Sequence, residues 1–147
     1  MEIKKAETKD INEQFLKIFS DLCTIHFRER PDYFFDPEKE NLPKILQYYI
    51  EEKETYILLE DQKIIGFAII EEKREGKPII RIKEIIIDEH YRHQGYGKKL
   101  VEYIKQLGKE KGCSALEFWC RAFNTNALQM YEHIGMKVQK IILETDL

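Results

Sequence analysis

Residues 78–111 constrain the fold of this chain most, because they describe a strand, a turn and a helix in immediate succession. Residues 78–88 are rich in isoleucine, a β-branched residue that favours strands. Gly95 and Gly97 interrupt the apolar pattern and mark a turn. Residues 97–111 then show helical spacing, with an apolar stripe made by Leu100, Val101, Ile104 and Leu107. This succession predicts a helix that packs on a β-sheet.

The rest of the chain alternates between helical and strand-like spacing. Apolar residues at helical intervals follow Thr8 and Asp10, and we expect one of these two residues to cap the first helix. Further helices are expected over residues 42–50 and 125–134, and strands over residues 2–6, 55–59, 64–71, 115–120 and 138–143. The pattern predicts one domain spanning residues 1–147, of mixed α/β (α+β) class.

Composition excludes several functional classes. The 147 residues carry a formal net charge of −3, without the basic excess that nucleic-acid binding requires. The longest apolar run, residues 64–70, is far too short to span a bilayer, and the charged first residues do not resemble a signal peptide. Three cysteines without metal-ligand spacing favour free thiols in a reducing compartment. We therefore expect a cytoplasmic protein that binds neither nucleic acid nor membrane.

The charge is distributed unevenly along the sequence. Residues 1–60 carry 9 basic and 14 acidic side chains, whereas residues 61–147 carry 15 basic and 13 acidic side chains. The two parts therefore have net charges of −5 and +2. This division reflects either ordinary solvated helix faces or a cationic partner on one side and an anionic partner on the other.

The turn at residues 92–97 has the features of an anion site. Its two glycines lack a Cβ, so the backbone is able to turn tightly and approach a ligand closely. Amide groups at the start of the following helix attract negative charge, and Lys98 and Lys99 place two cations there. The turn matches neither the phosphate loop of nucleotide hydrolases nor the dinucleotide-binding fingerprint. An ordinary strand-to-helix turn, or a nucleotide-binding domain that uses another phosphate, remains an alternative.

Two motifs resemble those of the GCN5-related N-acetyltransferase (GNAT) family. Residues 92–97 (RHQGYG) are similar to its central motif, [RQ]-x-x-G-x-[GA]. Residues 124–136 are similar to its second motif, N-x-x-A-x-x-x-Y-E-x-x-G-F, with Met136 in place of the phenylalanine. The motifs occur in the family's order and at its usual separation. The resemblance implies a mixed, mostly antiparallel central sheet flanked by helices, the fold of GNAT-like acyl-CoA N-acyltransferases.

The resemblance implies that acetyl-coenzyme A is the cosubstrate, with no metal. Residues expected to contact it are Ile85, Ile86 and Ile87 beside the pantetheine arm, Arg92, His93, Gln94, Gly95, Tyr96, Gly97 and Lys98 around the pyrophosphate, and Asn124 and Tyr131. In this family a bulge splays the sheet at the pantetheine site. The apolar parity changes between Ile82 and Ile85, as an inserted residue would produce, although a strand buried on both faces explains the pattern equally well.

Two residues are expected to carry the chemistry. By resemblance, Tyr131 would protonate the departing thiolate, because it is the motif tyrosine and a phenol is protonated at neutral pH. Its position on an apolar helix face also fits a core tyrosine. Glu84 lies at the expected bulge and is the candidate base for the amine, with a surface or ion-paired glutamate as the alternative.

The sequence thus predicts an N-acetyltransferase that moves an acetyl group from acetyl-coenzyme A directly to a primary amine. The acidic first 60 residues favour a small cationic acceptor. Alternatives are a peptide or protein N-acetyltransferase and a non-catalytic sensor that binds acetyl-coenzyme A. A homodimer is expected from relatives alone.

Overall fold

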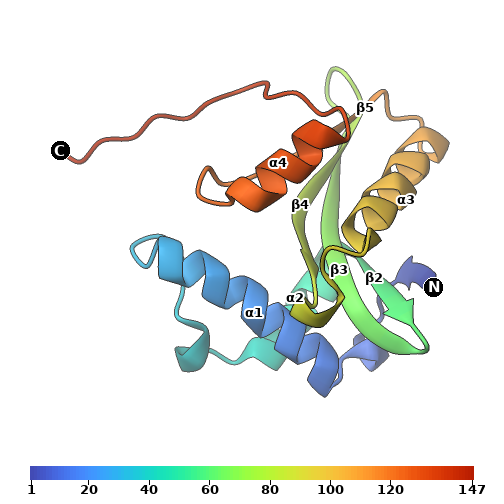
Figure 1. Cartoon of the computed structure of the whole chain (residues 1–147), viewed down its shortest axis with the longest axis vertical. Helices are drawn as coiled ribbons and strands as arrows, with labels where there is room; N and C mark the ends of the chain where they lie inside the picture. The colour runs from blue at the N-terminus through green and yellow to red at the C-terminus, as the bar shows by residue number, and fades with distance from the viewer.

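The computed structural model describes residues 1–147 as one mixed sheet with four α-helices (Figure 1). The strands are β1 (Glu2–Lys5), β2 (Glu54–Glu60), β3 (Lys63–Lys73), β4 (Ile79–Ile87) and β5 (Ala115–Phe118). The helices are α1 (Glu13–Glu29), α2 (Leu42–Glu52), α3 (Tyr96–Glu110) and α4 (Thr125–His133). Short 3₁₀ turns, η1 (Thr8–Asp10), η2 (Pro37–Lys39) and η3 (Glu89–Tyr91), join some of them.

The strands lie in the order β1-β2-β3-β4-β5. The first four strands pair antiparallel, and β5 pairs parallel to β4. The parallel pair is possible because α3 crosses between β4 and β5 and returns the chain to the same end of the sheet. The predicted mixed, mostly antiparallel sheet flanked by helices is therefore confirmed.

The two faces of the sheet carry separate hydrophobic cores. Alternating side chains of β3 divide between them: Phe67 and Ile69 pack with α1 and α2, while Ala68 and Ile70 pack with α3 and α4. Figure 1 shows α1 and α3 on opposite sides of the sheet. Fully burying one large apolar side chain contributes roughly 1.5–3 kcal/mol, so these two cores fix the strands that carry the site.

Helix α1 begins later than the sequence pattern predicted. Thr8 and Asp10 form the 3₁₀ turn η1, and Asn12 caps α1 instead, its Oδ1 accepting a hydrogen bond from the Phe15 amide at 2.9 Å. Because α1 begins after Asn12, its apolar residues Phe15, Ile18 and Phe19 pack into the core. None of the four helices is both long and apolar enough to cross a membrane.

Strand β4 contains the expected bulge. Ile82 pairs with Ile70 and Glu84 pairs with Ile69, so Lys83 is an extra residue in β4. The insertion moves the isoleucines of β4 from one parity to the other, as the sequence indicated. Pairing between β4 and β5 ends just before the bulge, at Ile82 and Phe118. Beyond that point β4 has a hydrogen-bonded neighbour on one side only.

The predicted last strand, residues 138–143, is wrong. Residues 137–147 have no regular secondary structure and lead away from α4 as an extended tail (Figure 1). The side chains of Ile141, Ile142 and Leu143 are 75%, 81% and 90% exposed. A strand requires a neighbouring backbone and a face to bury, and this segment has neither. Its short apolar run resembles a strand only at the level of composition.

Candidate functional site

The turn before α3 presents free backbone amides at one point. His93 and Gly95 both have positive φ values, 62° and 85°, and Gly95 occupies the N-cap position of α3. The first backbone hydrogen bond of the helix runs from the Lys99 amide to the Gly95 carbonyl, at 3.1 Å. The amides of Tyr96, Gly97 and Lys98 therefore precede the hydrogen-bonded ladder and are available to an anion.

Contacts with β4 and α4 hold this turn in place. The Arg92 Nε donates a hydrogen bond to the Ile87 carbonyl at 2.9 Å, and the Gln94 side chain donates to the His90 carbonyl at 3.3 Å. A Cβ on Gly97 would lie 3.4 Å from the Met130 sulfur, an ordinary contact distance, so α3 begins beside α4. The turn is thus a fixed feature at the end of β4.

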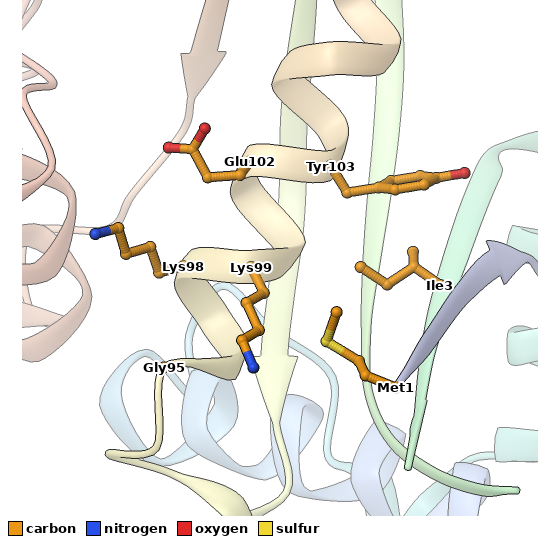
Figure 2. A pocket seen from close by; sticks show the side chains of 7 residues that line it. All are labelled: Met1, Ile3, Gly95, Lys98, Lys99, Glu102 and Tyr103. Carbon is orange, nitrogen blue, oxygen red and sulfur yellow. The ribbon is translucent and has the colours of Figure 1, made fainter.

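The first turn of α3 is electropositive. It contains no acidic residue and carries Lys98 and Lys99. The two side chains leave the helix in different directions, with Lys99 directed toward Met1 (Figure 2). Lys99 lines a surface hollow of about 620 Å³ between α3 and β1, completed by Met1, Ile3, Gly95, Lys98, Glu102 and Tyr103. Neither Glu84 nor Tyr131 lines this hollow.

The open side of β4 presents backbone groups at Ile85 and Ile87. The Asp88 amide bonds the Ile65 carbonyl of β3 at 2.7 Å, so by alternation Glu84 and Ile86 also direct their backbone toward β3. Ile85 and Ile87 direct theirs to the other side, where β5 no longer pairs. The Ile87 carbonyl is occupied by Arg92, which leaves the Ile87 amide and both backbone groups of Ile85 for a ligand.

Glu84 lies immediately after the bulge and faces α1. Its carboxylate is 3.1 Å from Nε2 of His26, and the His26 ring is largely buried. Burial, with the Glu84 charge as the second cause, raises the pKa of the Cys23 thiol to about 12. The same carboxylate adds to the effect of burial in raising the pKa values of Tyr49 and Cys120. Glu84 therefore contacts α1 through His26.

His26 was not predicted from the sequence. A signal was nevertheless present, because His26 continues the buried stripe of α1 that runs through Phe19 and Leu22, where another apolar residue would be expected. Its Nδ1 is buried without a hydrogen-bond partner. Its pairing with Glu84 joins residues 58 positions apart, and sequence spacing gives no indication of such a contact.

Tyr131 is 3% exposed and belongs to the core formed with α3. Its ring lies 4.1 Å from the Phe118 ring, centroid to centroid, and its hydroxyl is buried without a hydrogen-bond partner. Burial, with Cys120 as a second cause, raises the pKa of the phenol well above its ordinary value. Tyr131 is thus a core residue, and its role as an acid stays a prediction. An unpartnered buried hydroxyl costs about 1–3 kcal/mol unless a ligand satisfies it.

Asn124 caps α4, its Oδ1 accepting a hydrogen bond from the Ala127 amide at 3.4 Å. Glu84 and Tyr131 lie near the point where the pairing of β4 with β5 ends, whereas residues 92–98 form the turn and the helix start beyond β4. Glu84 approaches that point from the α1 face, and Tyr131 approaches it from the α3 face. Cys120 follows two residues after the end of β5, and burial together with the Glu84 charge raises the pKa of its thiol. Glu84 and Tyr131 thus lie on opposite faces of the sheet, near the end of the β4–β5 pairing.

Comparison with known proteins identifies the family. The model of the acetyltransferase (GNAT) family matches residues 15–136, most of the chain. The protein belongs to the GNAT family. The fold agrees: the structure of a tetramutant of the BH1408 protein from Bacillus halodurans superposes with a TM-score of 0.87 at 23% identity, covering 100% of both chains.

Two curated relatives of this GNAT protein are amine acetyltransferases by name. L-ornithine N5-acetyltransferase of Arabidopsis thaliana is 28% identical over 122 residues, 80% of this chain and 53% of that protein. Thialysine N-epsilon-acetyltransferase of Bos taurus is 30% identical over 56 residues, 38% of this chain and 33% of that protein. The matched segments thus span between a third and about half of these relatives' own length.

Proposed function

We propose that this GNAT protein is an N-acetyltransferase, formed as one domain by residues 1–147, that uses acetyl-coenzyme A to acetylate the primary amine of a small cationic acceptor. The observation that carries the proposal is the opening between β4 and β5. It has a carboxylate on one face and a buried, unpartnered phenol on the other. The amine acetyltransferases among its relatives support the same reaction class.

The residues at the opening fit the three parts of an acyl-coenzyme A molecule. The amides that begin α3, from Tyr96 to Lys98, suit the pyrophosphate, together with the positive-φ turn at His93 and Gly95. The free backbone groups of Ile85 and Ile87 suit the amide groups of the pantetheine arm. The buried hydroxyl of Tyr131 lacks the one partner that a thioester sulfur would supply.

Acetyl-coenzyme A supplies the acetyl group as a thioester. In the proposed reaction Glu84, held by His26, accepts the proton that the amine loses as its nitrogen bonds to the acetyl carbon. A backbone amide beside the bulge stabilises the developing oxyanion. Tyr131 donates its phenolic proton to the sulfur as the carbon–sulfur bond breaks. Burial keeps that phenol protonated, because it raises the pKa of Tyr131.

The test is release of free thiol from acetyl-coenzyme A with a panel of cationic, neutral and acidic amines. We expect turnover with cationic acceptors and a loss of about 10²–10⁴-fold in kcat for Glu84→Gln and for Tyr131→Phe. Tyr48→Phe and Glu110→Gln, at exposed positions on α2 and α3, serve as matched controls with unchanged rates.

Three results would each contradict part of the proposal. Binding of acetyl-coenzyme A without acetylation of any amine would indicate a sensor, which has no need of an acid. A Tyr131→Phe variant with the full rate would remove Tyr131 from the chemistry. Strong preference for neutral or acidic acceptors would exclude the cationic class.

A further inference from the structure

Arg121, just after β5, is a half-buried arginine that lacks a charged partner. The chain has three half-buried arginines: Arg30, Arg81 and Arg121. Arg30 pairs with Asp32 and Glu144, and Arg81 pairs with Glu71 and Glu117. Arg121 forms no ion pair and no side-chain hydrogen bond, and its guanidinium lies over the rings of Tyr33 and Phe34. A guanidinium taken partly out of water is costly without an anion.

Two aromatic side chains hold this guanidinium from the segment after α1. The Arg121 Cζ lies 4.3 Å from the centroid of the Tyr33 ring and 5.0 Å from that of Phe34. Cation–π contacts of this kind hold the guanidinium in place, and none of its N–H groups donates a hydrogen bond. Those N–H groups form a planar fork that matches a carboxylate. The N–H groups of Arg121 are therefore held in place but have no hydrogen-bond acceptor.

The guanidinium is connected to the candidate base through two side chains. The Phe34 ring that contacts Arg121 lies 4.6 Å from the His26 ring, and His26 holds Glu84. Phe123 contacts the other side of His26, at 5.8 Å between ring centroids. Arg121 and Glu84 are thus connected through the contacts of two side chains, Phe34 and His26.

We propose that Arg121 binds a carboxylate of the acetyl acceptor, so that the acceptor is a small amino acid with a second, distal amine. This inference rests on the proposed function and narrows its acceptor class. The distal amine reaches Glu84, the alkyl chain lies along the aromatic rings, and the carboxylate meets the guanidinium. Such a molecule is still cationic overall, as the acidic first 60 residues led us to expect. Simple diamines and polyamines lack the group that Arg121 would bind.

The experiment compares acceptors that differ only in the carboxylate. L-lysine is paired with 1,5-diaminopentane, and L-ornithine with 1,4-diaminobutane, at saturating acetyl-coenzyme A. We expect the wild type to prefer each amino acid by about tenfold or more in kcat/KM, mainly through KM, because a site built for a polar group rejects analogues that lack it. We expect Arg121→Met to keep the packing against the aromatic rings and to abolish the preference for the amino acid over the diamine. Arg121→Lys should retain part of that preference.

Control experiments distinguish binding of the acceptor's carboxylate from binding of a phosphate of acetyl-coenzyme A. The KM for acetyl-coenzyme A should stay unchanged in Arg121→Met, since a rise there would assign Arg121 to a phosphate of the cosubstrate and overturn the proposal. Arg28→Met, at an exposed position on α1, should retain the wild-type preference. Equal use of amino acid and diamine by the wild type would also overturn it, while leaving the acetyltransferase function intact.

Calorimetry gives a second readout that does not depend on turnover. With the protein saturated with coenzyme A, we expect L-lysine to bind at least tenfold more tightly than 1,5-diaminopentane, and Arg121→Met to abolish the difference. If no amine is acetylated, the proposed function fails, and the binding difference still decides the role of Arg121. Equal binding of the two ligands would overturn that role.

Discussion

At the scale of single residues, Asp88 shows how a buried carboxylate fixes the start of the site. It is 2% exposed and follows directly after β4. Its oxygens accept hydrogen bonds from the His90 amide at 2.9 Å and the Gln14 side chain at 2.6 Å, with Lys17 at 3.9 Å. Burial raises the pKa of Asp88, but these hydrogen bonds and charges outweigh it, and the pKa lies below its ordinary value.

We predict that Asp88→Asn lowers the free energy of unfolding by about 1–3 kcal/mol at pH 7, because charge-assisted hydrogen bonds are lost. Since the folded-state pKa of Asp88 is depressed, its stabilisation is complete above the unfolded-state pKa, about 4. It disappears as the pH falls through the lower folded-state pKa. Urea unfolding of both proteins from pH 7 to pH 3 measures the difference. Asp61→Asn, in an exposed turn, is the control, and a difference independent of pH would contradict the prediction.

At the scale of elements, the turn and α3 use their two glycines for different reasons. Gly95 has a φ of 85° and open space around its Cβ position, so only its backbone conformation requires glycine. Gly97 has no positive φ, and its Cβ position contacts Met130 at an ordinary distance. The first glycine is therefore needed to form the turn. Neither backbone conformation nor packing requires the second, so we infer that it serves the close approach of a ligand.

We predict that Gly95→Ala lowers the free energy of unfolding by about 1–2 kcal/mol, the cost of a left-handed conformation for a residue with a Cβ. It should also weaken binding of acetyl-coenzyme A, because the amides of the turn reorient. Gly97→Ala should weaken binding alone, since alanine favours a helix and its methyl group occupies the approach to the amides. Thermal unfolding and calorimetry with acetyl-coenzyme A measure both effects. Equal destabilisation by the two substitutions would refute this division.

At the scale of the whole molecule, residues 137–147 lie outside both cores. Their apolar side chains are mostly in solvent, and Glu144 forms a partly exposed ion pair with Arg30 at 3.1 Å. Exposed ion pairs contribute between zero and about 1 kcal/mol to stability. The folded state of residues 1–136 therefore gains little from this tail.

We predict that a chain ending at Met136 keeps its melting temperature within about 2 °C of the full chain, because it loses less than about 1 kcal/mol. Ile104→Ala, in the core between α3 and the sheet, should cost about 2–5 kcal/mol and calibrates the measurement. Thermal unfolding followed by circular dichroism compares the three proteins. A large drop for the shortened chain would show that the tail packs against the domain in solution.

Most elements and the bulge were predictable from the sequence because they depend on local spacing. The isoleucines of β4 change parity where the extra residue is inserted, and the glycines of the turn mark the start of α3. The cap at Asn12 and the tail were predicted wrongly, since cap choice and strand pairing depend on where the core lies. The local pattern of residues 138–143 does not indicate whether a neighbouring strand is present to pair with them.

The sequence by itself determined the order of the elements up to α4 and the turn before α3, and it made Glu84 and Tyr131 candidates for roles that stay predictions. Tertiary structure alone decided that His26 holds Glu84, that the Tyr131 hydroxyl has no partner, and that Arg121 lacks an anion. The reason is physical. Periodicity is set by neighbours along one helix or strand, whereas burial and charge pairing are set by residues that folding brings together from distant parts of the chain.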